Sequence, residues 1–324
     1  MFFTFTYEIP YYVYKPGAAD PLEEMIVIEE GKESDGDFHL VTVSGAKATP
    51  IFYLMGKILP YHEIVPIQEA RPDGISDEDY MHLQLKLMES SHHSSTVVAY
   101  EAAGEEVEIV HNGVYILEIV ENMPAEAVIN VGDRIHQVDG IEIKEAEDLV
   151  KYVEKKQPGE EVEFVIERDG QKQRHQIEVV AFPDDPEKVG IGVKLVTDIQ
   201  VEVERNVQIK SGKIGGPSAG LMFALEMYDK LIDEDLTKGY NIAGSGEIDF
   251  EGNVSRIGGI DKKVVAAHRN DIDIFFAPHE NGHPESNYVV AKQTAEDIKT
   301  DMEIVPVDTF EDAIHYLEEL KPKE

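Results

Sequence analysis

Alternation between apolar and polar positions predicts two short strands near the start of the chain, over Met25–Glu29 and Phe38–Ser44. The stretch Asp35-Gly36-Asp37 lies between them and is typical of a turn. The two strands are therefore expected to form a hairpin. Further on, apolar residues at helical spacing predict one long helix, which begins with Ser76 as its N-cap and ends near Ala103.

A polar run, Ser90-Ser91-His92-His93-Ser94-Ser95, lies in the middle of that helix. The run predicts a polar helix face. Adjacent His92 and His93 point to different sides of a helix, so they cannot bind one metal ion together as histidines four residues apart can. A metal site is therefore not expected there.

The pattern changes at Gly104, where short strand signals replace the long helix. Residues 104–183 contain many strand signals and one amphipathic helix, Ala146–Lys155. A run of proline and aspartate from Pro183 to Pro186 predicts a linker where this module ends. The predicted strands of the module are Val107–His111, Val114–Glu118, Arg134–Val138, Glu161–Arg168 and Gln173–Val180.

Strands and helices alternate over the rest of the chain, after strand signals within residues 189–213. Such alternation is typical of an α/β domain with parallel strands. The predicted helices cover residues 221–232, 261–269, 291–299 and 309–320, and the predicted strands between them cover residues 273–277 and 302–307.

Composition limits the function classes. The 324 residues include 29 Lys and Arg against 65 Asp and Glu, which gives a net charge of −36 at pH 7. Acids spread along the chain predict a solvated surface and argue against nucleic acid as a partner, because phosphate binding needs a basic patch. The chain has no cysteine, which excludes thiol nucleophiles and disulfides. No apolar run reaches the roughly 18 residues of a membrane-spanning helix.

The most distinctive chemistry lies in Gly215-Gly216-Pro217-Ser218-Ala219-Gly220-Leu221, a glycine-rich turn that presents one serine before an apolar helix. Unpaired N–H groups at a helix start favour negative charge, as an oxyanion hole requires. A serine nucleophile also needs a base to take up its proton. His268 is the conventional candidate, and Lys262 or Lys263 can serve if burial lowers the pKa of the amine.

Three motifs in order, GGPSAGL, GSGEI and GGIDKKVVAAHR, together with the apolar strand that follows them, closely resemble the proteolytic domain of the Lon family. The resemblance implies a catalytic Ser/Lys dyad of Ser218 and Lys263. Many members of that family carry an acidic residue where this chain has Gly215, so a role of that acid does not transfer. The resemblance also implies supporting roles for Ser245, Gly216 and Pro217.

Residues 105–182 resemble a PDZ domain of the bacterial type, since GVYI, PAEA, VGDRI and VDG occur in the order typical of that family. In the family, one loop binds the C-terminal carboxylate of a peptide and a helix closes the groove. The resemblance assigns the helix to Ala146–Lys155. It assigns the loop to Gly113, Val114, Tyr115 and Ile116. The alternative is a PDZ-like domain that packs against its neighbour and binds no peptide.

Nearly the whole chain resembles the PDZ-containing, membrane-anchored Lon-like proteases of Gram-positive bacteria. The expected fold is α+β or α/β, with a β-rich PDZ domain inserted into a Lon-type proteolytic domain. Residues 1–103 are expected to hold an N-terminal extended segment and the first part of the proteolytic domain, residues 104–183 the PDZ domain, and residues 184–324 the main proteolytic part. No GxxxxGK[ST] motif is present, so no ATPase module is expected in this chain.

The resemblance predicts an ATP-independent serine endopeptidase that cleaves flexible or unfolded protein segments, which the PDZ domain recruits or gates. The expected partners are protein or peptide substrates and further copies of the chain, with neither nucleic acid nor ATP. No cofactor or metal is expected. The aromatic start of the chain fits a segment that follows an N-terminal membrane anchor, which would place the catalytic part outside the cell.

Two other functions stay open at this point. GPSAG also fits the G-x-S-x-G turn of α/β-hydrolases, in which Ser218, His268 and an acid such as Asp249 would form the triad of an esterase. A non-catalytic PDZ scaffold would bind peptides and cleave nothing.

Overall fold

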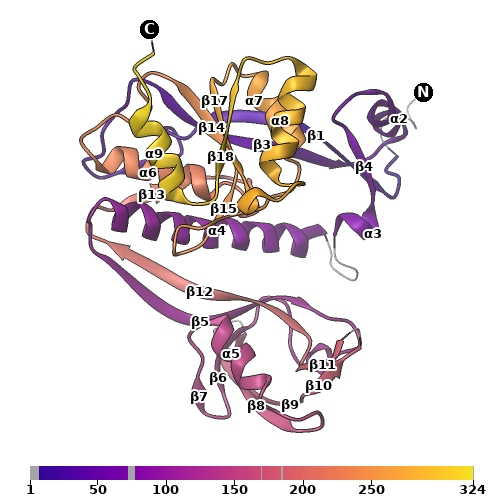
Figure 1. Cartoon of the computed structure of the whole chain (residues 1–324). Helices are drawn as coiled ribbons and strands as arrows, with labels where there is room; N and C mark the ends of the chain where they lie inside the picture. Colours follow the sequence, from indigo (N-terminus) through magenta and orange to yellow (C-terminus); the bar gives the residue numbers. More distant parts are fainter. Residues whose placement is uncertain (1–6, 72–76, 169, 184, 324) are drawn as a thin grey trace. The chain divides into compact units, whose positions relative to one another are not determined.

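The structure is a computed structural model that describes residues 7–71, 77–168, 170–183 and 185–323 (Figure 1). Contacts divide the chain into two compact units. Unit 1 combines Met1–Val107 with Val203–Glu324, and unit 2 consists of Glu108–Glu202. Unit 2 therefore interrupts the sequence of unit 1.

Unit 1 is built on a six-stranded sheet with the strand order β18-β17-β14-β3-β1-β4. The N-terminal strands pair antiparallel, the C-terminal strands pair in parallel as predicted, and β3 joins β14 in parallel. One sheet thus unites the segments before and after unit 2. Its strands are β1 (Tyr11–Pro21), β3 (Asp37–Lys47), β4 (Glu63–Pro66), β14 (Asn241–Gly244), β17 (Ile274–Pro278) and β18 (Glu303–Val307).

Helices cover both faces of this sheet. Successive side chains of a strand point to opposite faces, so each central strand contributes to the core on both sides. Ile274 and Phe276 of β17 lie in the core formed with α4, α6 and α9, whereas Phe275 and Ala277 lie in the core formed with α7 and α8. Every residue of β17 is buried, as expected for a central strand. The helices are α4 (Asp77–Ala102), α6 (Gly220–Leu231), α7 (Ile260–His268), α8 (Asn287–Ile298) and α9 (Phe310–Glu319).

The predicted N-terminal hairpin is wrong. Strand β2 (Ile26–Ile28) pairs with β13 (Val207–Ile209), while β3 pairs with β1. The predicted long helix is confirmed as α4, although Ser76 lies outside the described residues. None of the described helices is both long and apolar enough to cross a membrane. The smaller elements of unit 1 are α2 (Pro50–Ile58), α3 (Ile67–Ala70), β15 (Glu247–Ile248) and β16 (Val254–Ser255).

The polar run of α4 lies partly in the interior: Ser91, Ser94 and Ser95 are buried, and Ser90, His92 and His93 are half-buried. This part of α4 packs against α6 (Figure 1). His92 meets the ring of Phe223 edge to face at 4.9 Å between centroids, and burial lowers the pKa of His92 to about 4. Hydroxyl side chains tolerate such burial because they can donate to a carbonyl one turn back in the helix, as Ser94 and Thr96 do. The buried hydroxyl residues are Ser91, Ser94, Ser95 and Thr96.

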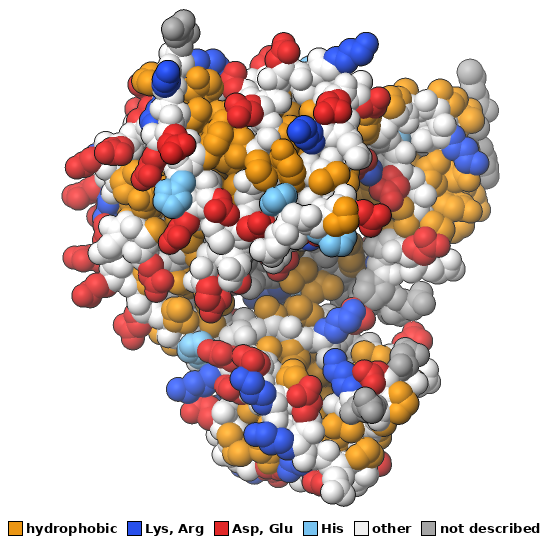
Figure 2. Space-filling view, viewed as in Figure 1, with side chains coloured by type: hydrophobic (Ala, Val, Ile, Leu, Met, Phe, Trp, Pro, Cys, Tyr) orange, Lys and Arg blue, Asp and Glu red, His pale blue; other side chains and the backbone are white. Residues whose placement is uncertain are grey.

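Carboxylates are scattered over the visible surface, with lysine and arginine side chains between them (Figure 2). This distribution agrees with the predicted solvated acidic surface. Exceptions occur in α6, where Glu226 and Asp229 are buried. Glu226 pairs with Lys230 at 3.1 Å, and burial nevertheless raises the pKa of Glu226 to about 7.

Unit 2 is a β-rich domain with its own core. Its sheet has the order β12-β5-β6-β8-β9, with β7 paired to β6. Leu149 and Val153 of α5 and Ala125 of the short helix η1 pack into this core. The elements are β5 (Val107–Ile119), η1 (Pro124–Ala127), β6 (Arg134–Val138), β7 (Ile141–Glu142), α5 (Ala146–Val153), β8 (Glu161–Arg168), β9 (Gln171–Glu178) and β12 (Val193–Val203).

The stretch predicted as a linker is part of unit 2. Strands β10 (Val180–Phe182) and β11 (Asp185–Gly190) pair with each other, and Asp184 between them lies outside the described residues. A Cβ atom on Gly190 would lie 2.6 Å from the ring of Phe182, so only glycine lets this ring rest on the backbone. Unit 2 therefore continues beyond the predicted domain end at residue 183.

Candidate active site

The turn that carries Ser218 precedes α6, which begins two residues later at Gly220. Gly216 has a φ of +90°, a conformation that favours glycine. A Cβ atom on Gly215 would lie 2.6 Å from the Cβ atom of Gln84, so a side chain at this position would push α4 away from the turn. This contact favours glycine at position 215.

Main-chain contacts hold the serine turn in place. Ser91 Oγ of α4 donates to the carbonyl of Pro217 at 3.1 Å, and Ser95 Oγ donates to the carbonyl of Gly220 at 2.8 Å. The N–H of Gly246 donates to the carbonyl of Ser218 at 3.0 Å. These contacts position Ser218 through its backbone and leave its hydroxyl group for another partner. Ser91 and Ser95 are functional supports that the sequence pattern did not reveal.

The partner of the Ser218 hydroxyl group is Lys263, in the first turn of α7. The Nζ atom of Lys263 lies 2.7 Å from Ser218 Oγ and 2.7 Å from Ser245 Oγ. Ser245 Oγ in turn donates to the carbonyl of Ser218 at 2.8 Å. Lys263 is 4% exposed and Ser245 is 0% exposed. Burial lowers the pKa of Lys263 to about 7, so the neutral amine is well populated near neutral pH.

The other two candidate bases have different surroundings. Lys262 is also buried, but its Nζ atom pairs with Glu63 Oε2 at 2.7 Å. His268 is exposed, and its Nδ1 atom lies 3.0 Å from the hydroxyl oxygen of Thr300. Among the described residues, neither one hydrogen bonds to Ser218. The structure therefore brings Ser218, Lys263 and Ser245 together and leaves Lys262 and His268 apart.

In unit 2, the residues predicted to form a carboxylate-binding loop form part of a strand. Gly113, Val114, Tyr115 and Ile116 lie inside β5, where Val114 pairs with Ile135 of β6. The N–H of Ile116 donates to the carbonyl of Asp133 at 2.9 Å, and the side chains of Val114 and Ile116 are fully buried. The loop assignment is wrong, because neighbouring strands already occupy this segment.

A groove of about 110 Å³ lies elsewhere in unit 2, between α5 and the segment Lys188–Leu195. This segment contains Gly190-Ile191-Gly192, with a φ of +82° at Gly192. A helix that faces an extended segment across a groove is the arrangement in which PDZ domains bind peptides. The apolar residues that line the groove include Leu149, Val150, Val153, Phe182, Ile191 and Val193.

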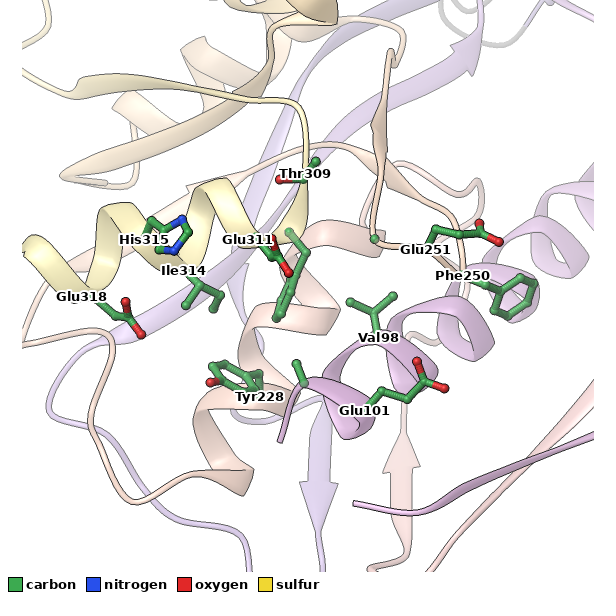
Figure 3. A pocket seen from close by; sticks show the side chains of 13 residues that line it. Val98, Glu101, Tyr228, Phe250, Glu251, Thr309, Glu311, Ile314, His315 and Glu318 are labelled. Carbon is green, nitrogen blue, oxygen red and sulfur yellow. The ribbon is translucent and has the colours of Figure 1, made fainter. Parts of the chain in front are cut away.

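Unit 1 has a further groove of about 560 Å³ between the end of α4 and α9 (Figure 3). Its apolar lining includes Val98, Tyr228, Phe310 and Ile314. Four glutamates, Glu101, Glu251, Glu311 and Glu318, also line it. Ser218, Lys263 and Ser245 do not line this groove, so it is separate from the candidate active site.

The fold agrees with comparisons to known proteins. Residues 190–319 match the family described as the Lon protease (S16) C-terminal proteolytic domain. Residues 101–179 match the PDZ domain family. Residues 190–319 are thus similar to the proteolytic domain of Lon-type serine peptidases, and residues 101–179 are similar to a PDZ domain. The predicted fold class, a mixed α/β protein with these two domains, is confirmed.

Individual relatives show the extent of the similarity. The Lon protease of Mesomycoplasma hyopneumoniae is 33% identical over 114 residues, which cover 35% of this chain and 12% of that protein. The Lon protease of Campylobacter jejuni is 30% identical over 138 residues, or 41% of this chain and 17% of that protein. The chain thus spans less than a fifth of these relatives. The solved PDZ domain of the SdrC-like protein of Listeria monocytogenes is 26% identical, with coverage of 28% and 93% and a TM-score of 0.26.

Proposed function

We propose that this protein is an ATP-independent serine endopeptidase in which Ser218 is the nucleophile and Lys263 is the general base. One observation carries the proposal: a buried lysine amine lies 2.7 Å from the hydroxyl oxygen of a serine in a glycine-rich turn before a helix. An amine that is buried without a carboxylate partner is easily deprotonated, and a neutral amine can accept the proton of a hydroxyl group. Lys263 has no ion-pair partner among the described residues.

The reaction would proceed by acyl transfer. The Lys263 amine takes the Ser218 proton while Ser218 Oγ bonds to the carbonyl carbon of the substrate, whose π electrons move to the oxygen. When the tetrahedral intermediate collapses, the peptide C–N bond breaks and the ammonium of Lys263 gives its proton to the leaving amine. Water then attacks the acyl-enzyme, with Lys263 as base, and releases the carboxylic acid. Lys263 finally returns a proton to Ser218.

The N–H of Ser218 is our proposed donor to the oxyanion. No described group accepts a hydrogen bond from this N–H. Gly216 is not a second donor in this proposal, because its N–H already donates to the carbonyl of Gln84 at 2.8 Å. In this proposal Gly216 and Pro217 shape the turn and take no direct part in the chemistry.

Ser245 would hold Lys263 in line with the nucleophile. Its hydroxyl oxygen accepts a hydrogen bond from Lys263 Nζ, and its proton goes to the carbonyl of Ser218. This arrangement fixes the end of a long flexible side chain, whose freedom would otherwise reduce the fraction of productive geometries. Ser245 is thus a positioning residue in the proposed mechanism.

Lys263 also predicts the pH dependence of cleavage. Because the base must be neutral and its pKa is lowered to about 7, kcat/KM should rise about tenfold from pH 6 to pH 8 and then level off. Initial rates on a short fluorogenic peptide across pH 6–9 measure this profile. The His268→Ala variant should follow the same curve. A wild-type profile that is flat from pH 6 to 9 would contradict a lysine base.

The substrates are proposed to be flexible or unfolded protein segments, because no nucleotide-binding motif is present in this chain to drive unfolding. The full chain, incubated without nucleotide, should cleave a permanently unfolded protein at least about 100-fold faster than the same protein in its folded state, since local opening limits attack on a native chain. Mass spectrometry of the released peptides gives both rates. If neither form is cleaved, the chain is better described as a PDZ scaffold.

In our proposal the PDZ domain recruits or gates these substrates at the groove between α5 and Lys188–Leu195. An apolar C-terminal peptide would lie along the extended segment, and holding it there would raise its local concentration near the protease. This location replaces the Gly113–Ile116 assignment.

Other parts of the proposal depend on resemblance. Residues up to Val107 contribute three strands to the sheet of unit 1, which supports their assignment to the same proteolytic domain. Likeness to membrane-anchored Lon-like proteases supports an N-terminal anchor outside this sequence and a catalytic part outside the cell. It also supports assembly with further copies of the chain.

The esterase alternative is not favoured. His268 is exposed and bonds to Thr300, and Asp249 binds the side chain of Asn253 at 2.8 Å. The three members of the hypothetical triad thus make separate contacts.

A further inference from the structure

A cavity of about 580 Å³ lies beside the serine turn, and Gly215 forms part of its wall. Tyr12, Tyr14, Tyr80 and Met81 also line it. They come from β1 and from the first residues of α4. Tyr12 and Tyr14 stack with ring centroids 6.1 Å apart, and the Tyr14 ring rests on Gly45, where a Cβ atom would lie 2.7 Å from it.

The cavity is fixed relative to the nucleophile. Gln84 lines the cavity, and its carbonyl accepts the N–H of Gly216 at 2.8 Å. Gly215 also packs closely on Gln84, since a Cβ atom on Gly215 would lie 2.6 Å from the Cβ atom of Gln84. Gly215 is three residues from Ser218, a span of at most about 11 Å. An extended peptide advances about 3.3 Å per residue, so the cavity lies within reach of a side chain three or four residues from the scissile bond.

The chemistry of the lining favours an uncharged occupant. Lys47 and Asp77 form an ion pair with each other, and the Tyr12 hydroxyl group donates to Asp77 at 3.4 Å. Glu8 and Lys213 also line the cavity, and Lys47 lies 3.9 Å from Glu8. The four charged residues of the lining are therefore two of each sign, and their charges sum to zero. Aromatic faces and a thioether remain, and both contact rings and aliphatic chains favourably. Met81 is 47% exposed, so part of this apolar surface is open to water when nothing covers it.

We infer that this tyrosine-lined cavity, formed by Tyr12, Tyr14, Tyr80 and Met81, is a substrate subsite that selects a large aromatic or aliphatic side chain a few residues from the cleaved bond. The inference rests on the proposed endopeptidase function. It explains how the proposed ATP-independent enzyme would prefer unfolded chains, because such side chains are buried in folded proteins and become available only when the chain opens.

The test is a cleavage-site profile. The full chain digests an unfolded protein, and mass spectrometry records which residues flank each cleaved bond. We expect large aromatic and aliphatic residues to be enriched about tenfold at one position within four residues of the bond. Tyr80→Ala should remove most of this enrichment, whereas Tyr80→Phe should keep it because the ring remains.

Met81→Asp is a second variant, and it leaves the ring of Tyr80 in place. An acid in the first turns of a helix is tolerated, and here it would place a charge in the apolar wall. The preferred residue at that position should change from aromatic to lysine or arginine, with at least a tenfold drop in kcat/KM for an aromatic peptide. The control is Phe250→Ala, which removes an exposed ring from the separate groove of Figure 3 and should leave the profile unchanged.

The outcomes separate the subsite from the proposed function. If the wild-type chain cleaves nothing, the endopeptidase proposal fails. If it cleaves without positional enrichment, or if Tyr80→Ala and Met81→Asp retain the wild-type profile, the enzyme stands and the subsite is overturned.

Discussion

Replacing Lys263 by methionine should lower kcat/KM for peptide cleavage at least about 1,000-fold, because the Ser218 proton then has no acceptor. The same substitution at the adjacent position, Lys262→Met, should change kcat/KM less than about threefold. Lys262 is just as buried, but its amine pairs with Glu63 instead of the serine. The two variants differ by one position along α7 and are matched in size and charge.

Stability should move in the opposite direction to activity in Lys263→Met. The pKa of Lys263 is lowered from 10.5 to about 7 in the folded protein, so burial of the charged form costs on the order of a few kcal/mol at neutral pH. Methionine removes this cost, and the variant should melt at a higher temperature than the wild type. As pH rises from 7 to 10.5, the wild type gains stability and the difference should shrink. Melting curves at pH 7 and pH 10 measure both effects.

Equal losses of activity in the two lysine variants would contradict the assignment of Lys263 as the base. A lower melting temperature in Lys263→Met at pH 7 would show that the buried charge of Lys263 does not destabilise the folded protein. In Lys262→Met the melting temperature should change little, because the Glu63 side chain is 56% exposed and can be rehydrated.

The contact between Ser218 and Lys263 illustrates what sequence patterns can predict. The two residues are separated by 45 positions, yet each lies in a glycine-rich segment of recognisable spacing. Glycine is required there for physical reasons, since Gly216 and Gly259 have positive φ values. Choosing Lys263 over Lys262 relied on a family pattern, because two consecutive helical residues look alike in composition.

The support from α4 could not be predicted in the same way. Ser91 and Ser95 resemble solvated residues in a one-dimensional pattern, because hydroxyl groups are polar. Their burial depends on acceptors 126 and 125 residues away, the carbonyls of Pro217 and Gly220. Only the packing of α4 against α6 reveals that these hydroxyl groups hold the serine turn.

The predicted carboxylate-binding glycine, Gly113, lies within β5, and the groove of unit 2 lies at a different glycine-containing segment. GVYI at residues 113–116 and VGIGV at residues 189–193 both combine glycine with apolar residues, so local pattern does not separate them. The pairing of strands does distinguish the two segments, because Val114 of β5 pairs with Ile135 of β6 inside the sheet. The segment around Ile191 instead lies beside α5, across an open groove.

Ser218→Ala should reduce cleavage by at least about 1,000-fold while leaving the melting temperature within about 2 °C of the wild type. The fold should tolerate the change because the carbonyl of Ser218, which alanine retains, accepts the hydrogen bonds from Gly246 and Ser245. Peptide release and thermal melting on the same preparations measure the two effects. Ser255→Ala, at an exposed serine of β16, is the control and should change neither.

Ser245→Ala distinguishes a positioning residue from the nucleophile. Alanine leaves the Lys263 amine with one partner fewer and the Ser218 carbonyl with one donor fewer. We expect a loss of about 10- to 100-fold in kcat, because the amine reaches the productive geometry less often, and about 1 kcal/mol of lost stability. Ser245→Thr keeps the hydroxyl group and should restore most of the rate. If Ser245→Ala were as inactive as Ser218→Ala, Ser245 would have a chemical role. If the rate of Ser245→Ala were unchanged, the Lys263 amine would not need the hydrogen bond to Ser245 for its position.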